Sequence, residues 1–303
     1  MIITQTRQSG RAWLRSGLSA ALLLSLSCSV VLSACSWTHA GTAQTVPKLR
    51  DSTSKEQTVL QVQTATQTLQ LSRAQLLALP ELKTIALESD VAYGGRRSYR
   101  ALPLQTFYPD LSALNLQFTA LDGFVATLPA SVFNTSARPW LAIEDAAAPW
   151  PALAAGKPSA GPVYLVWQDP EHQVSSEQWP YQIAKISLTQ TLEQRYPQLL
   201  PRASGPQQTQ ALRGMQVYTK NCAACHSMNG GGDAKLGPDL NLPHSPVEYF
   251  QEGMLRQLIR NPASVRSWPA SAMPGFNLQS LSAQELDDLL LYFRQMAQQK
   301  EKD

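Results

Sequence analysis

The chain has 303 residues, of which 44% are hydrophobic and 16% are charged, and this composition excludes a disordered or fibrous protein. The formal net charge of +3 comes entirely from Arg7, Arg11 and Arg15 near the N-terminus. Beyond them, 22 basic residues balance 22 acidic ones, and neither a basic stripe nor an RNA-binding motif is present, which excludes nucleic acid as a partner. The length is sufficient for two domains of ordinary size.

Residues 1–34 predict a secretory signal peptide. The three arginines come first, the apolar run LSAALLLSLSCSVVL follows, and small residues end the segment. Serines interrupt the apolar run, which is shorter than the roughly 20 residues that a permanent membrane-spanning helix needs. The mature protein is therefore expected to be exported.

Residues 32–35, LSAC, resemble the bacterial lipobox, in which a leucine lies three residues before a cysteine. The resemblance implies cleavage before Cys35 and lipid attachment to it, and each buried methylene adds about 0.8 kcal/mol to membrane binding. Ser36 stands where an aspartate holds lipoproteins at the inner membrane, so the resemblance implies a lipid anchor in the outer membrane of a bacterial envelope, facing the periplasm. The alternative is ordinary cleavage near Ala40, which leaves a soluble protein.

After a polar, threonine-rich stretch at 35–57, which predicts a flexible linker, residues 58–202 predict an α+β domain. SRAQLLALP, 72–80, predicts a short helix that ends at the proline. ARPWLAIEDAAAPWPALAAGKPSAGP, 137–162, predicts a long surface loop because it is rich in proline and small residues. Short strands are predicted for TVLQVQTATQTLQL, TIALES, LNLQFTAL, FVATLP, PVYLVWQD and QIAKISLT.

LPRASGPQQTQ, 200–210, predicts a domain boundary, and residues 203–303 predict an all-α domain. QQTQALRGMQVYTKN predicts a first helix and VEYFQEGMLRQLIRNP a second, which stops at Asn261–Pro262. SAQELDDLLLYFRQMAQQK predicts a third helix, in which Ser282 and Glu285 have the spacing of a capping box.

The motif Cys222-Ala-Ala-Cys225-His226 lies between the first two of these helices. Structural zinc would need four ligands, and no other cysteine lies in this domain. A thioredoxin-like dithiol belongs to a βαβ scaffold, whereas this motif lies among helices. The third possibility is covalent haem, because two thiols about one helical turn apart can add to the two vinyl groups of one porphyrin edge while the histidine binds the iron. C-x-x-C-H is the signature of that attachment, so we expect one haem c on Cys222 and Cys225 with His226 as an iron ligand.

With this motif, residues 207–299 resemble the class I cytochrome c family. In that family the proline of a GP pair, here Pro238, offers its carbonyl to the second nitrogen of the haem-ligating histidine, which fixes the ring. SAMPGF, 271–276, resembles the methionine-ligand loop, so the resemblance implies Met273 as the second axial ligand. Pro274 disfavours helix at Met273 and keeps the loop extended. Met254, on a predicted helix, is the rival ligand.

The family resemblance also implies close packing of the first helix on the last through Gly214 and Tyr218; the alternative for the glycine is a tolerated defect of the helix. Arg260, Arg266 and Trp268 flank the Met273 loop and are candidates for contacts with the haem propionates. The alternative for these three is a solvated charge or a packed ring.

Residues of about 58–190 resemble the molybdopterin-binding domain of the sulfite-oxidase superfamily through YGGRRSYRALPLQTF, LDGFVATLP, GPVYLVWQD and WPYQIAKISL. That superfamily holds molybdenum with a cysteine thiolate, but no cysteine lies between 36 and 221. The resemblance therefore implies a degenerate domain that docks a partner or positions the haem module.

Together these features predict a multidomain lipoprotein cytochrome that carries single electrons from a dehydrogenase to a cytochrome or oxidase, and an electron-transfer protein rather than a stand-alone enzyme. The alternative is a haem-containing subunit of an oxidoreductase whose N-terminal domain binds substrate or a molybdopterin-type cofactor. A haem sensor, in which Met273 dissociates and a gas binds, is a third possibility.

Overall fold

The computed structural model describes residues 57–170, 173–267 and 273–300. All described residues belong to one compact unit, Gln44–Asp303. The signal peptide, Cys35, nearly all of the predicted linker and Trp268 lie outside the described residues. Below, 58–189 is called the sheet region and 192–297 the helical region.

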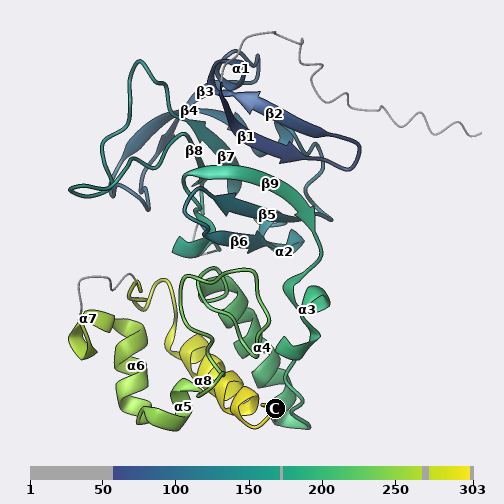
Figure 1. The fold of residues 1–303 in the computed structure, drawn as a ribbon, viewed down its shortest axis with the longest axis vertical. Helices are drawn as coiled ribbons and strands as arrows, with labels where there is room; N and C mark the ends of the chain where they lie inside the picture. The colour runs from purple at the N-terminus through teal and green to yellow at the C-terminus, as the bar shows by residue number, and fades with distance from the viewer. Residues whose placement is uncertain (1–56, 171–172, 268–272, 301–303) are drawn as a thin grey trace, which may run out of the picture. The chain divides into compact units, whose positions relative to one another are not determined.

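The sheet region contains a five-stranded sheet of order β2-β1-β9-β5-β6 and a four-stranded sheet of order β3-β4-β7-β8 (Figure 1). Neighbouring strands are antiparallel except β1 and β9, which are parallel. The strands are β1 (Thr58–Gln63), β2 (Thr68–Ser72), β3 (Lys83–Leu87), β4 (Arg97–Pro103), β5 (Asn115–Ala120), β6 (Val125–Leu128), β7 (Arg138–Ile143), β8 (Val163–Gln168) and β9 (Ile183–Thr189).

The core of the sheet region follows the two-residue period of its strands. Along β5, Leu116, Phe118 and Ala120 are buried and the intervening residues are only partly so. The predicted short helix is α1 (Arg73–Leu77), and a reciprocal capping box between Ser72 and Gln75 starts it. The prediction of an α+β region is confirmed, whereas the likeness to the molybdopterin-binding domain stays a prediction.

The prediction of a surface loop over 137–162 is wrong in its first quarter. Residues Arg138–Ile143 form β7, which lies between β4 and β8 in the four-stranded sheet. Leu141, Ala142 and Ile143 are buried, so this strand contributes to the core. The residues after this strand are rich in proline and alanine, which favour a loop. Because the whole segment 137–162 shares that composition, its composition does not reveal the six-residue strand at its start.

The helical region is all-α, as predicted. Its longest helices are α4 (Pro206–Asn221), α6 (Glu252–Arg260) and α8 (Ala283–Ala297). Short turns complete it: α3 (Leu192–Arg195), α5 (Pro246–Tyr249) and α7 (Pro262–Val265). The predicted capping box at the start of α8 is confirmed, because Ser282 accepts a hydrogen bond from the Glu285 amide and Glu285 accepts one from the Ser282 amide.

The single helix predicted over 247–262 is instead divided into α5 and α6, whereas its predicted stop at Asn261–Pro262 is confirmed. Phe250 is extended (φ −99°, ψ 138°), which ends α5, and Gln251 caps α6 from an extended conformation. Asn261 leaves the helical range before Pro262, which starts α7. The apolar spacing continued across Phe250, so periodicity alone could not show this break.

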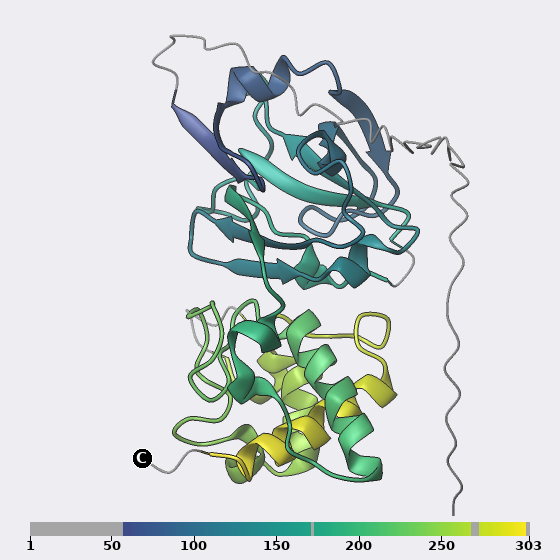
Figure 2. The same cartoon turned by 90° about the vertical axis from the view of Figure 1, so that its right-hand side faces the viewer.

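Helices α4 and α8 form the centre of the helical region and lie against each other in both views (Figures 1 and 2). A Cβ atom at Gly214 would overlap the backbone carbonyl of Asp288, so this glycine is what allows the two helices to approach. The rings of Tyr218 and Tyr292 lie 5.7 Å apart in the same contact. Gly214 is therefore a packing residue, not a tolerated defect.

The apolar core of the helical region takes in Leu192 and Leu199, which precede the boundary predicted at 202. The Tyr292 hydroxyl donates to the Leu199 carbonyl at 2.9 Å, which ties this segment to α8. Among the described residues, no helix has the length and apolar character to cross a membrane.

Candidate haem-attachment site

The C-x-x-C-H motif forms a tight turn directly after α4. The amides of Cys225 and His226 both donate to the carbonyl of Cys222, at 3.0 and 2.9 Å. This one-turn geometry follows from the end of α4, where Cys222 keeps nearly helical backbone angles (φ −119°, ψ −36°). Both thiols are free and partly buried. The turn therefore holds two unpaired thiols about one helical turn apart.

The electrostatics of the two thiols differ from those of a redox dithiol. Burial, with a smaller contribution from the negative charge of Glu177, raises the pKa of Cys222 and that of Cys225 to about 12 each. Reactive dithiols work as thiolates and have lowered pKa values. The surroundings of this pair thus do not favour thiol–disulfide exchange.

His226 is held in one orientation by the loop that follows it. Its Nδ1 lies 2.8 Å from the carbonyl oxygen of Pro238, which can only accept, so Nδ1 carries the proton and Nε2 keeps its lone pair. The Tyr218 hydroxyl donates to the His226 carbonyl at 2.8 Å. Burial lowers the pKa of His226, which favours the neutral imidazole that binds metals.

Two residues of this loop that sequence reasoning missed make the contact possible. A Cβ atom at Gly237 would overlap the His226 imidazole, so only glycine lets the chain pass against the ring. One carboxylate oxygen of Asp239 accepts from the amides of Asn241 and Leu242, both at 2.8 Å, and the other accepts from Gly230 at 2.8 Å. The signal for Asp239 was its place just after the GP pair, because aspartate bonds to backbone amides one to three residues further on in turns.

The methionines divide into core residues and exposed ones. Met215 and Met296 belong to the apolar core, as their helical spacing predicts. Met254 on α6 and Met273 after α7 are 42% and 37% exposed. Met273 lies outside any helix, at the start of the last described stretch, 273–300. Its ligation of iron stays a prediction.

The candidates for propionate contacts occupy different surroundings. The Arg260 guanidinium donates to backbone carbonyls in the segment that follows Met273, including Phe276 at 2.9 Å and Asn277 at 3.1 Å. Arg266 caps the C-terminal end of α7 and is exposed. Trp268 lies outside the described residues. Contact with a propionate stays a prediction for all three.

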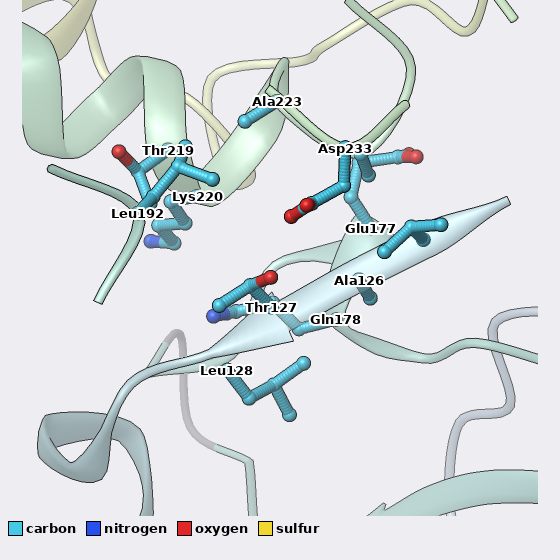
Figure 3. A pocket seen from close by; sticks show the side chains of 12 residues that line it. Ala126, Thr127, Leu128, Glu177, Gln178, Leu192, Thr219, Lys220, Ala223 and Asp233 are labelled. Atoms are coloured by element: carbon cyan, nitrogen blue, oxygen red, sulfur yellow. The ribbon is translucent and has the colours of Figure 1, made fainter. Parts of the chain in front are cut away.

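A small pocket lies beside the attachment turn (Figure 3). Ala223 and Ala224, the two residues between the cysteines, line it together with Glu177 of the 3₁₀ turn η2 (Ser176–Gln178) and with Thr127 of β6. Its volume of about 10 Å³ is room for one water molecule at most, so it is not a cofactor site. Burial raises the pKa of the Glu177 carboxyl.

The sequence model of the cytochrome c family matches residues 211–297. This part of the chain is a cytochrome c domain, and the cofactor of that domain is covalently bound haem c. Similar proteins are the cytochrome c subunits named "Alcohol dehydrogenase (quinone)" of Gluconacetobacter polyoxogenes and Komagataeibacter europaeus. Each is 35% identical over 94 residues, which cover 28% of this chain and 19% of the relative. The chain thus spans about a fifth of the length of these curated relatives.

The residues of the turn fit haem c. The thiols of Cys222 and Cys225 are free, His226 has one nitrogen bonded to protein and the other available, and Gly237 leaves room for the ring. Cys222 also packs against the apolar core of the helical region, which supplies the low-polarity surroundings in which haem proteins bury the porphyrin.

Proposed function

We propose that this chain is a periplasm-facing lipoprotein cytochrome that carries one electron at a time between a dehydrogenase and a downstream acceptor. The observation that carries the proposal is the hydrogen bond between His226 and the Pro238 carbonyl, directly after the Cys222–Cys225 turn. This bond leaves Nε2 of a neutral histidine available next to two free thiols. The match of residues 211–297 to the cytochrome c family supports the same conclusion.

Different residues of the chain would attach the haem and bind its iron. Cys222 and Cys225 would hold the haem through thioether links, and His226 would bind the iron through Nε2, because the Pro238 carbonyl holds the other ring nitrogen. We propose Met273 as the second axial ligand, a thioether that raises the reduction potential relative to a second histidine. The haem, when bound, supplies one-electron chemistry at iron. If His226 and Met273 both bound the iron, no position would be left for a small ligand.

We propose a dehydrogenase as electron donor because the relatives at 35% identity are cytochrome c subunits of a quinone alcohol dehydrogenase. The acceptor would be another cytochrome or an oxidase. The same relatives also suit the second candidate, a haem-containing oxidoreductase subunit. In the electron carrier, the sheet region, as a degenerate molybdopterin-binding-like domain, would dock the partner or position the haem module, whereas in the second candidate it would bind substrate or a molybdopterin-type cofactor.

We further propose that lipid on Cys35 anchors the protein to the outer membrane. The lipobox-like LSAC supports the anchor. Metabolic labelling with a fatty acid tests it, with Cys35→Ala as the matched control. Label in the wild-type protein that disappears in the variant is expected, and label that persists in the variant rejects the anchor.

The electron-carrier function is tested by mixing the purified full-length protein with a quinone-dependent dehydrogenase and its substrate. We expect the haem to be reduced stoichiometrically, one electron per chain, and then reoxidised by an added oxidase or cytochrome. Product formation by the chain without any dehydrogenase would instead favour the enzyme. Carbon monoxide binding to the resting ferrous protein would favour a sensor.

A further inference from the structure

Arg260, the last residue of α6, lies partly buried against the chain segment that follows Met273. Its guanidinium donates to four backbone carbonyl groups across 276–282: those of Phe276 at 2.9 Å, Asn277 at 3.1 Å, Ser282 at 3.2 Å, and Leu281. Nη1 donates to the carbonyls of Phe276, Asn277 and Leu281, and Nη2 donates to that of Ser282. One side chain thus connects the end of the loop with the start of α8.

The backbone of α6 also contacts this loop. The Phe276 amide donates to the Ile259 carbonyl at 3.0 Å, and the Phe276 ring is buried in the apolar core. A Cβ atom at Gly275 would lie 2.6 Å from the Arg260 carbonyl oxygen, so the loop backbone lies directly on the end of α6. These contacts begin two residues after Met273.

We propose that Arg260 is a positioning residue, which fixes the segment 275–282 on α6 and thereby sets where the Met273 thioether lies. This inference rests on the proposed ligation of iron by Met273. It gives Arg260 a task different from the propionate contact expected from sequence. The loop lacks secondary structure between Gly275 and Asn277, so its orientation depends on bonds of this kind.

Arginine suits this task better than lysine does. A guanidinium presents five N–H donors in a planar fork, whereas an ammonium presents three from one point. Hydrogen bonds from a charged donor are shorter and about twice as strong as neutral ones. Lysine at 260 would reach one or two of the four carbonyls and leave the others without this donor.

The test compares Arg260→Met with Arg256→Met in the full-length, haem-loaded protein. Arg256 is on the same helix but forms ion pairs with the side chains of Glu252 and Asp287, at 2.7 and 2.6 Å, and has no described bond to the loop. The first readout is the sulfur-to-iron charge-transfer band of the ferric protein as the pH is raised. The second is hydrogen exchange of the Phe276 amide, which needs no metal signal.

For Arg260→Met we expect the band to disappear at least one pH unit lower than in the wild type, and the Phe276 amide to exchange about tenfold faster or more. Covalent haem and helical circular dichroism should be retained. Arg256→Met should leave both readouts near wild type. If Arg260→Met does not accumulate, Arg260→Lys is measured in its place. The pH at which its band disappears should lie between the wild-type value and the value expected for Arg260→Met.

Two results contradict the inference in distinguishable ways. If the wild type shows the band and the variants at 260 keep both its pH midpoint and the Phe276 exchange rate, or change no more than Arg256→Met, Arg260 does not position the loop. If the wild type itself lacks the band, ligation by Met273 fails, and the proposed role of Arg260 fails with it.

Discussion

The sheet region and the helical region differ in what surrounds their glycines. In the sheet region, Gly94, Gly95, Gly123 and Gly156 have positive φ angles and open space where a Cβ atom would stand; Gly161 is the exception, because its Cβ would overlap Glu144. In the helical region, Gly205 and Gly230 are also of the open kind, but a Cβ atom at four other glycines would lie within 3 Å of a neighbouring atom. These are Gly214 against Asp288, Gly231 against Gln198, Gly237 against His226 and Gly275 against Arg260.

This difference shows where close packing restricts the residue to glycine. Glycines of the first kind shape turns, and a side chain there meets only backbone strain. Those of the second kind allow close approach between segments, for example of α4 to α8 and of the Gly237 loop to the His226 ring, and the four in the helical region lie in the part of the chain that matches the cytochrome c family. We therefore expect substitutions in the helical region to affect haem properties, whereas matched substitutions in turns of the sheet region should not.

The largest expected effect is on haem itself. Replacing Cys222 and Cys225 together by serine removes both thiols and should abolish covalent haem, because a hydroxyl does not form the thioether links. Haem staining after denaturing electrophoresis measures this. Arg96→Ala in the sheet region is the control, since that side chain is 72% exposed and should leave haem staining unchanged. Haem that survives denaturation in the double variant contradicts the assignment.

Replacement of Met273 by alanine should leave haem attached but lower the reduction potential. If Met273 binds the iron as proposed, its loss removes the ligand that favours ferrous iron, so a shift on the order of 100 mV is expected within the roughly 0.8 V range that axial ligands span. Potentiometric titration followed by absorbance measures it. Met254→Ala is the matched control, and a shift confined to that variant would transfer the ligand role to Met254.

A pair of glycine variants tests the close contact between α4 and α8. Gly214→Ala should destabilise the protein by about 3 kcal/mol, because the added methyl meets a backbone carbonyl that cannot move aside. Gly253→Ala on α6 meets nothing within 4 Å and should be neutral or stabilise by about 0.5 kcal/mol. Chemical denaturation of both variants measures the difference, and equal stabilities would contradict the close contact of α4 and α8.

The smallest expected effect concerns two aspartates in turns. Burial alone would raise the pKa of Asp239, but hydrogen bonds from Gly230, Asn241 and Leu242 outweigh it and lower the pKa below its ordinary 3.8. The resulting stabilisation is present above pH 3.8 and is lost as the pH falls through the lower folded value. Asp239→Ala should cost about 2 kcal/mol at neutral pH, since it leaves partly buried amides unbonded.

Asp110 provides the comparison from the sheet region. It is exposed and accepts a bond from the Ser112 amide at 2.8 Å. Asp110→Ala should therefore not shift the denaturation midpoint measurably. If its shift equals that of Asp239→Ala, the loop around Pro238 is no more constrained than an ordinary surface turn.

Much of the fold follows from local sequence patterns. Alternation predicted the strands around Phe118 and Ile186, and Ser282 with Glu285 marked the start of α8. The strand Arg138–Ile143 escaped prediction because burial depends on partners far away in sequence, here β4 and β8. The break at Phe250 also escaped, since a single extended residue does not alter apolar spacing.

The residues of the site that lie in short contiguous motifs could be predicted from the sequence. The Cys222–His226 turn and the carbonyl of Pro238 could be named from sequence, and the structure contains the bond between them. Gly237, Asp239 and Arg260 could not be assigned in this way. Their roles depend on what folds against them, which is an imidazole ring, backbone amides and backbone carbonyls from other segments.

The most direct test of the account is a potentiometric titration of the mature, full-length protein, followed by exposure of the ferrous form to carbon monoxide. We predict one reversible one-electron transition per chain and a ferrous spectrum that carbon monoxide does not change. Rapid binding of carbon monoxide at rest, or the lack of a reversible one-electron transition, would contradict an electron carrier whose iron is held from both sides by its own side chains.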